Sequence, residues 1–135
     1  MSKMFCQIDE MMILELWEQC NLSKEDFEFM ARVVAAEAGT THWDNQVAVA
    51  SVIWNRVSSD HFPDTVEGVL TESGQFSTVN HGDCSTPTVD ACRRAIVYAY
   101  LNRPLPEDVL FFRAFYYFSG LKHYAKVADN YFSYE

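Results

Sequence analysis

Residues 29–39 read FMARVVAAEAG, a run rich in valine and alanine that contains one carboxylate, Glu37. A capping-box-like start at Ser23 and a natural stop at Gly39 flank the run, because glycine adopts left-handed backbone angles without strain. These signals predict a helix over residues 24–38, with Glu37 in its last turn.

Glu37 is expected to point toward the interior. At about 100° per residue, Glu28 and Glu37 lie half a turn apart, and Glu28 marks the solvent face. The neighbours of Glu37 at helical spacing are Met30, Val33 and Val34. Burial and the negative end of the helix dipole both disfavour the ionised carboxylate, so we predict a raised pKa for Glu37, as a general acid requires. The alternative is a structural role as a cap, in an ion pair with Arg56, or at the solvent.

Three further helices are predicted after this one. The first begins at Asp44 and continues through NQVAVASVIWNRV, which is apolar nearly all round and so belongs in the centre of the domain. A short helix follows in HFPDTVEGVL, with Asp64 in a capping position. The last has Thr86 and Pro87 as cap and first turn and runs to about Leu101.

The other segments predict loops and strands. Residues 73–87 have the composition of a loop, with one short strand at 75–79. VLFFRAFYYF and NYFSY near the C-terminus are rich in residues that suit a pleated surface. We therefore expect an α+β, mostly helical fold with a small antiparallel sheet.

Length and charge limit the possible classes of function. A chain of 135 residues suits one domain, here a helical lead-in over residues 1–22, with its helix at 8–20, and a core over 23–135. The net charge of -9 argues against a nucleic-acid partner, and no apolar run is long enough to span a membrane. The first twenty residues do not resemble a signal peptide. Oligomeric state stays open, with a monomer favoured.

The cysteines and histidines predict neither disulfides nor a metal site. Cys6, Cys20, Cys84 and Cys92 form no CxxC pair, so we interpret them as free thiols. His81 and Cys84 make an isolated HxxC without a second ligand pair. We expect no metal and no cofactor.

Residues 30–57, MARVVAAEAGTTHWDNQVAVASVIWNRV, resemble the opening motif of the SleB/CwlJ-type cell wall hydrolases, the spore cortex-lytic family. FPDTVEGVL and GQFSTV follow in the same order and spacing, so the resemblance covers roughly residues 28–80 well and the rest loosely. It implies a lysozyme-like domain that cleaves peptidoglycan glycan strands between N-acetylmuramic acid and N-acetylglucosamine. Glu37 would be its essential acid, and the reaction would be lytic transglycosylation with one carboxylate as acid and then base.

The same resemblance suggests substrate contacts. Gln75, Phe76 and Ser77 match the family's QFS block and would be expected along the glycan, although Phe76 also suits a core position. Aromatic residues such as Trp43, Tyr116 and Tyr117 are candidates to stack on sugars, with a core role as the alternative for each. Asn130 stands where the family tends to have a histidine.

Hydrolysis would need a second carboxylate. Asp44 and Glu67 are better explained as helix caps, so Glu72 is the candidate that stays open.

Two alternatives remain at this point. Relatives often carry a second glutamate where this chain has Thr41, and together with Asn130 this allows a catalytically silent wall-binding or regulatory module. Amidase action on the stem-peptide link is the other, although that chemistry commonly uses zinc. Without a signal peptide, the chain is expected to be made in the cytoplasm and to act on wall or cortex as a phage lysin, a sporulation protein or a fragment of an exported chain.

Overall fold

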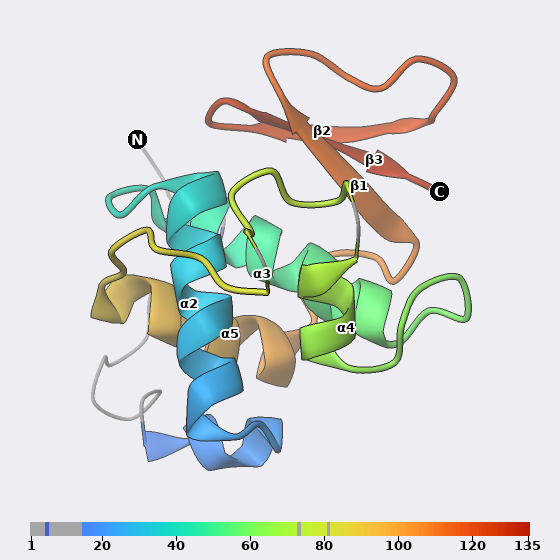
Figure 1. Cartoon of the computed structure of the whole chain (residues 1–135). Coiled ribbons are helices and arrows are strands. Elements are labelled where there is room, and N and C mark those ends of the chain that lie inside the picture. Colours follow the sequence, from blue (N-terminus) through green and yellow to red (C-terminus); the bar gives the residue numbers. More distant parts are fainter. Residues whose placement is uncertain (1–4, 6–14, 73, 81) are drawn as a thin grey trace.

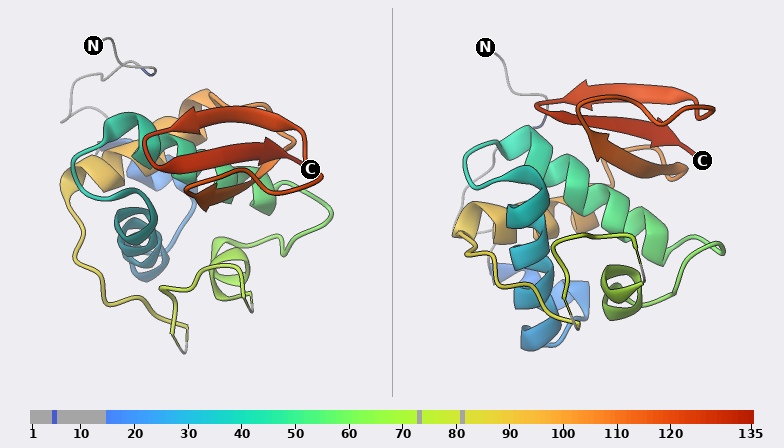
Figure 2. Two further views of the ribbon diagram at one scale, coloured as in Figure 1. Left: turned by 90° about the horizontal axis from the view of Figure 1, so that it is seen from above. Right: turned by 45° about the horizontal axis from the view of Figure 1, so that its top comes forward.

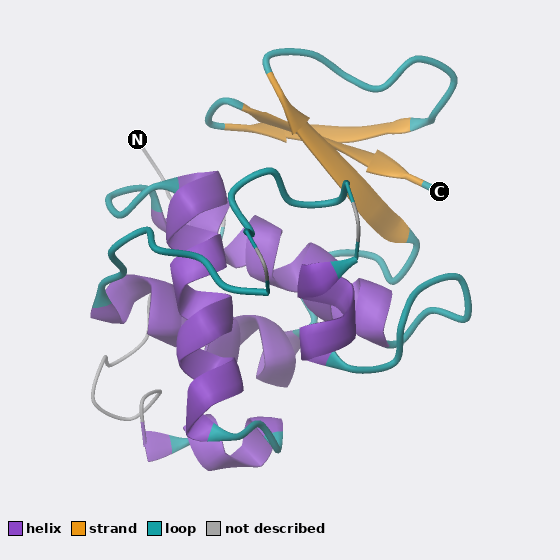
Figure 3. Ribbon diagram, viewed as in Figure 1, coloured by secondary structure: helices purple, strands orange, loops and turns teal. Residues whose placement is uncertain are grey.

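The computed structural model describes residues 5, 15–72, 74–80 and 82–135 (Figure 1). Its elements are, in chain order, the 3-10 helix η1 (Trp17–Cys20), α2 (Lys24–Ala38), α3 (Trp43–Val57), α4 (Val66–Thr71), α5 (Asp90–Asn102), β1 (Val109–Ala114), β2 (His123–Val127) and β3 (Asn130–Tyr134). Helices dominate and the strands lie together at the C-terminus (Figure 3). The predicted mostly helical α+β fold with a small antiparallel sheet is therefore confirmed.

Helix α3 forms the centre of the domain, as its apolar sequence predicts. Its residues Val47, Val49, Val52 and Ile53 have no exposed surface. Helices α2 and α5 pack on it, and the sheet lies over it (Figure 2). Each fully buried side chain of this size contributes about 1.5–3 kcal/mol relative to an exposed one.

The polar residues near the C-terminal end of α3 join this helix to the sheet. Asn55 Nδ2 donates to the carbonyl oxygens of Pro106 and Val109 at 2.9 and 3.1 Å. Arg56 Nε donates to the carbonyl of Leu110 at 2.8 Å. Because these acceptors are main-chain groups at and before the start of β1, the bonds hold the sheet in place on the helix.

The sheet has the order β1-β3-β2, and both pairs are antiparallel. Phe112 pairs with Phe132, and Ala125 pairs with Phe132 from the other side. Phe132 is completely buried, so this row faces the helices. The sheet is the part of the fold that reaches over the end of α2.

Helix α2 has the predicted bounds, and the ends of the other helices differ. The N-cap of α3 is His42, and Asp44 lies inside the first turn, where its carboxylate accepts from the Phe5 amide at 3.0 Å. The cap of α4 is Thr65 rather than Asp64, because the Thr65 hydroxyl accepts from the Gly68 amide at 3.0 Å.

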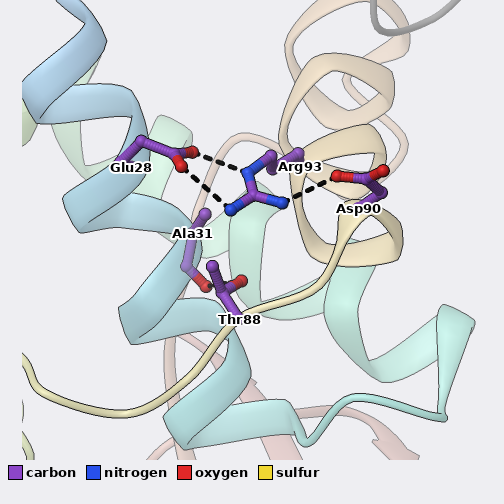
Figure 4. A network of polar contacts seen from close by, with 5 residues as sticks. All are labelled: Glu28, Ala31, Thr88, Asp90 and Arg93. Carbon is purple, nitrogen blue, oxygen red and sulfur yellow. Dashed lines mark hydrogen bonds and ion pairs between the residues drawn. The ribbon is translucent and has the colours of Figure 1, made fainter.

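Helix α5 begins at Asp90, later than predicted, after an N-cap at Val89. The hydroxyl of Thr88 donates to the Ala31 carbonyl at 2.8 Å, so the preceding segment is bound to α2 instead of starting a helix (Figure 4). An ion-pair network also joins α2 and α5, in which Arg93 binds both Glu28 and Asp90.

The predicted strand at 75–79 is wrong. These residues form turns, in which the Gln75 amide donates to Glu72 and the Val79 amide to Phe76. Phe76 is drawn into the core, which favours a turn over an extended segment. The predicted lead-in helix over 8–20 lies mostly outside the described residues, and 17–20 form η1.

No helix in the described part of the chain is long and apolar enough to cross a membrane.

Candidate active site

Glu37 lies in the last turn of α2, and its side chain is half-buried. Its Oε1 accepts a hydrogen bond from the Thr78 hydroxyl at 3.3 Å. Burial raises the pKa of Glu37, while the Thr78 bond and the positive charge of Arg56 lower it in part. The net direction is upward, as predicted from the sequence. A raised pKa is the direction of shift that a general acid requires.

The backbone that carries Glu37 is held by side chains from distant parts of the chain. Asn130 Nδ2 donates to the Glu37 carbonyl at 2.9 Å and to Asn45 Oδ1 at 3.0 Å. Gln46 Nε2 donates to the Gly39 carbonyl at 3.0 Å. These donors satisfy carbonyl groups that a helix end leaves without intrahelical partners. The last turn of α2 is therefore fixed in position relative to α3 and β3.

Gly39 is required at the stop of this helix. Its φ is +77° and its amide donates to the Ala35 carbonyl at 2.8 Å. A residue with a β-carbon adopts this conformation at a cost, so glycine lets the chain leave the helix directly after the turn that carries Glu37.

Arg56 connects the loop of residues 74–80 to the body of the domain. Its Nη1 donates to Gln75 Oε1 at 3.0 Å, while its Nε is held by Leu110. The guanidinium also lies over the rings of Phe62 and Phe76, at 4.8 and 5.5 Å from their centroids. Burial lowers the pKa of Arg56 to about 10, against the opposing attraction of nearby carboxylates. Figure 1 shows this loop (yellow-green) passing beside the upper, C-terminal end of α2.

The structure separates the predicted substrate residues into two groups. Gln75 and Ser77 are exposed on the loop that also carries Thr78, and Tyr116 is 59% exposed after β1. Phe76 and Trp43 are interior residues, 5% and 7% exposed.

Both interior rings have core partners. Phe76 packs against Phe112 with centroids 6.3 Å apart, and Trp43 lies edge-on to Tyr98 at 5.7 Å. A ring covered in this way has no free face for a sugar, so the core interpretation holds for Phe76 and Trp43. Tyr117 also has aromatic partners, since it stacks on His123 at 3.7 Å.

Asn130 is 4% exposed and uses its amide nitrogen within the protein. It is therefore placed as a support for the end of α2 rather than as a group reaching toward a ligand. Asn130 is the first residue of β3, and the packing of this strand brings it next to the Glu37 backbone although the two residues are far apart in sequence.

Two residues at the site were not among the predicted site residues. Thr78 belongs to the GQFSTV block but is not one of its predicted substrate residues, and the sequence predicts Arg56 only as an internal hydrogen-bonding residue or ion-pair partner. Arg56 has the predicted internal bonds, yet its charge also acts on Glu37. No local pattern identifies such roles, because both depend on contacts between separate segments.

Glu72 stays the candidate second carboxylate. It follows α4 directly and is close enough to Arg56 to raise the pKa of that guanidinium. Asp44 is used by the Phe5 amide. Glu67 lies in the first turn of α4, where its negative charge interacts favourably with the helix dipole.

Within the described residues, no three histidine, cysteine or acidic side chains are grouped to bind a metal ion. Cys20, Cys84 and Cys92 are free and buried, as expected for thiols without partners. Cys6 and His81 lie outside the described residues, so the HxxC pair is only half described.

Comparison with known proteins places this arrangement in a family. A model of the cell wall hydrolase family matches residues 41–132. The chain belongs to the cell wall hydrolase family. The match runs from the start of α3 into β3 and begins just after Glu37, so it includes Arg56, Thr78 and Asn130 but not the carboxylate that they surround.

Relatives in this family are spore cortex-lytic enzymes. Those of Oceanobacillus iheyensis and Bacillus subtilis are 39% identical over 97 residues and 32% identical over 90 residues. The alignments cover 72% and 67% of this chain but 33% and 30% of the relatives. The chain thus spans about a third of the length of these proteins.

Two solved structures have the same fold as this cell wall hydrolase. The catalytic domain of the Bacillus cereus SleB protein aligns with a TM-score of 0.69 at 28% identity, over 82% of this chain and 91% of that one. The catalytic domain of the germination-specific lytic transglycosylase SleB from Bacillus anthracis gives 0.67 and 27%, over 83% and 96%. The resemblance to SleB-type hydrolases is therefore confirmed, together with the fold that it implies.

Proposed function

We propose that this chain cleaves the glycan strand of peptidoglycan between N-acetylmuramic acid and N-acetylglucosamine as a lytic transglycosylase. The observation that carries the proposal is the state of Glu37, a half-buried carboxyl group whose pKa is raised by burial and which has a single neutral side-chain donor among the described residues. Such a group can donate a proton first and accept one afterwards.

The reaction needs only this one carboxyl group. Protonated Glu37 donates its proton to the glycosidic oxygen as the bond from that oxygen to C1 of the muramic residue breaks. The resulting carboxylate then accepts the proton of the muramic 6-hydroxyl while O6 bonds to C1, which closes a 1,6-anhydro ring. The proton and the electron pairs balance without a water molecule, so no second carboxylate is required, in contrast to hydrolysis.

Gln75, Ser77 and Tyr116 are the predicted substrate contacts that retain exposed side chains. We assign them to the sugar hydroxyl and acetamido groups and to a sugar face. Three further residues would position the site without contacting the sugar. Asn130 holds the Glu37 backbone, Arg56 holds the loop through Gln75, and Thr78 holds the Glu37 carboxylate. Fixed groups of this kind lower the cost of reaching the reactive geometry.

The relatives suggest a source for the substrate. They include spore cortex-lytic enzymes and a germination-specific lytic transglycosylase. We extend this to the present chain as a proposal that its substrate is cortex or cell wall peptidoglycan.

The test uses purified peptidoglycan sacculi with the unmodified chain and its Glu37→Gln variant. Mass spectrometry of the soluble products should find anhydro-muramic ends that are formed only by the unmodified chain. Reducing ends would instead indicate hydrolysis and direct attention to Glu72, and released stem peptides would indicate an amidase. Equal cleavage by the Glu37→Gln variant would overturn the assignment of Glu37.

A further inference from the structure

The sheet has a second face, opposite to the row that packs on the helices. Phe112, Phe132 and Ala125 form the inner row. The next residue along each strand points the other way, so Arg113, Tyr131 and Lys126, which pair in register, form an outer row. In Figure 2 the described helices lie beneath the sheet and none covers this outer side.

The outer row is basic in a chain that is strongly acidic. The whole chain has 19 acidic and 10 basic residues, yet residues 109–134 contain Arg113, Lys122 and Lys126 against Asp129 alone. In the described part of the chain, Arg113 and Lys126 form no ion pair and instead lie over rings. Arg32 and Arg93, by contrast, are bound by carboxylates. A surface of this charge favours an anionic partner.

Two exposed aromatic side chains border this row. Phe115 and Tyr116 are 76% and 59% exposed, and no other large aromatic side chain among the described residues is as exposed. Tyr116 contacts Arg113, whose guanidinium lies over its ring at 4.1 Å and donates to its hydroxyl at 2.9 Å. Exposed aromatic rings are suited to flat, partly apolar ligands.

The backbone at Phe115 is in a conformation that costs free energy. Its φ is +76°, in a region where residues with a β-carbon are rare, and its amide is bound to the Asp129 carbonyl at 3.0 Å. The strain presents a ring to solvent and gains no core contact, which is the pattern of a functional site.

This region adjoins the end of α2. Phe115 is bonded to Asp129, and the next residue, Asn130, is bonded to the Glu37 carbonyl. The Asn130 side chain is buried on the inner side of the sheet, so Glu37 and the outer row lie on opposite sides of the sheet and are linked through β3.

We propose that the face formed by Arg113, Phe115, Tyr116 and Lys126 binds a peptidoglycan glycan strand at a site separate from the point of cleavage. The choice of this polymer rests on the function proposed above. Its sugar rings offer apolar faces for Phe115 and Tyr116, and its stem peptides carry carboxylates that Arg113 and Lys126 attract. We call these four residues the aromatic–basic face.

The experiment measures sedimentation of the full chain with purified sacculi, in the Glu37→Gln background so that the polymer stays intact. Adding Phe115→Gly should raise the dissociation constant about tenfold, the size of effect expected for a ring in direct contact. The same change should raise the melting temperature, because glycine relieves the strain at this position. A residue that serves only the fold would not show this opposite pair of effects.

The contribution of the basic residues to binding is tested with Lys126→Gln, which should weaken binding to sacculi severalfold and make that binding less sensitive to salt. Lys24→Gln and Leu101→Ala are matched controls, since they remove an exposed cation and an exposed apolar side chain elsewhere. On glycan strands freed of stem peptides, the Phe115→Gly effect should persist and the Lys126→Gln effect should vanish.

Unchanged sedimentation of both face variants would overturn this inference, and so would equal losses in the controls. The outcome is separate from that for cleavage. A chain that releases no soluble products but binds sacculi through this face would refute the transglycosylase and leave the inference standing. A chain that cleaves while its face variants bind normally would refute the inference alone.

Discussion

Glu28 and Glu37 lie on the same helix and have contrasting surroundings. Glu28 accepts two bonds from Arg93, at 2.6 and 2.9 Å, and Arg93 is held further by Asp90 at 2.7 Å (Figure 4). Glu37 is in the last turn, beside apolar surface, and its side-chain donor among the described residues is a neutral hydroxyl at 3.3 Å.

This difference shows how one residue type takes two roles. A carboxylate bound in a fork by a guanidinium serves as an anchor between helices. A carboxyl group that is half-buried next to a weak neutral donor keeps its proton to higher pH. Burial alone therefore does not define the acid, since Glu28 is also partly buried. The two glutamates differ in that Glu28 is bound by a guanidinium, whereas no cation among the described residues is bonded directly to Glu37.

The largest expected contrast is in activity. Glu37→Gln should lower the release of soluble products from sacculi about 100- to 10,000-fold, because the proton donor is removed. Glu28→Gln is the matched control at the other end of the helix and should leave the rate nearly unchanged. If both variants lost activity equally, the two ends of α2 would not differ in the way described.

The next effect concerns the support of the active end. Asn130→Ala should lower the free energy of unfolding by about 1–3 kcal/mol, because it leaves the Glu37 carbonyl and Asn45 Oδ1 without their donor. Asn102→Ala removes a similar amide-to-carbonyl bond at an exposed position and should cost clearly less. Urea unfolding of both variants makes the comparison. A smaller loss for Asn130→Ala than for Asn102→Ala would contradict the proposed support.

The opposite end of α2 should respond in stability alone. Glu28→Gln should cost roughly 1 kcal/mol, a modest figure because both side chains of the pair keep partial contact with solvent. The loss should shrink at high salt, which screens the pair in the unmodified chain. A stability that is insensitive to both the substitution and the salt would mean that this pair does not anchor the helices.

Substitution of Glu37 should raise the stability of the chain, whereas substitution of Glu28 should lower it. Its pKa is raised in the folded chain, so the folded state keeps a proton that the unfolded state loses as the pH rises. The free energy of unfolding must then fall as the pH rises from the unfolded pKa of about 4.3 to the folded value. Since glutamine does not titrate, Glu37→Gln should be more stable than the unmodified chain above this window.

Melting temperatures measured from pH 3.5 to 8 would detect this effect. The two curves should converge at the acid end. A variant that is less stable than the unmodified chain at pH 7 would show that the ionised carboxylate is stabilising, contrary to the contrast with Glu28.

The smallest effect is expected for Thr78→Val. The Thr78 bond lowers the pKa of Glu37, so its loss should raise that pKa further and move the alkaline limb of the pH–activity profile to higher pH. Thr78→Ser keeps the hydroxyl and should retain the original limb. A shift toward lower pH with Thr78→Val would mean that Glu37 is not the group that must be protonated.

Local signals were sufficient for much of the fold. The bounds of α2 follow from Ser23 and Gly39, because capping and stopping a helix depend on groups within a few residues of its end. The apolar run of α3 and the strand-forming residues near the C-terminus likewise determined a central helix and a sheet. The predicted starts of α4 and α5 were wrong because hydroxyl groups near them form other bonds. The Thr65 hydroxyl caps α4, and the Thr88 hydroxyl binds the Ala31 carbonyl of α2.

The family and the acid were also evident in the sequence. Motif order identified a SleB-type hydrolase, and helical spacing placed Glu37 on the apolar side of its helix. The sequence could not distinguish the aromatic residues. Trp43 and Tyr116 have similar chemistry, yet one is in the core and the other is exposed, since exposure depends on which elements pack above a ring.

The composition and local order of the residues determined the helices, the sheet and the position of Glu37 on its helix. Tertiary structure alone decided which groups surround that carboxylate. Thr78, Asn130 and Arg56 come from a loop, a strand and another helix, and they meet only because packing brings these segments together. Contacts of this kind depend on the relative positions of whole elements, and no local pattern in the chain records them.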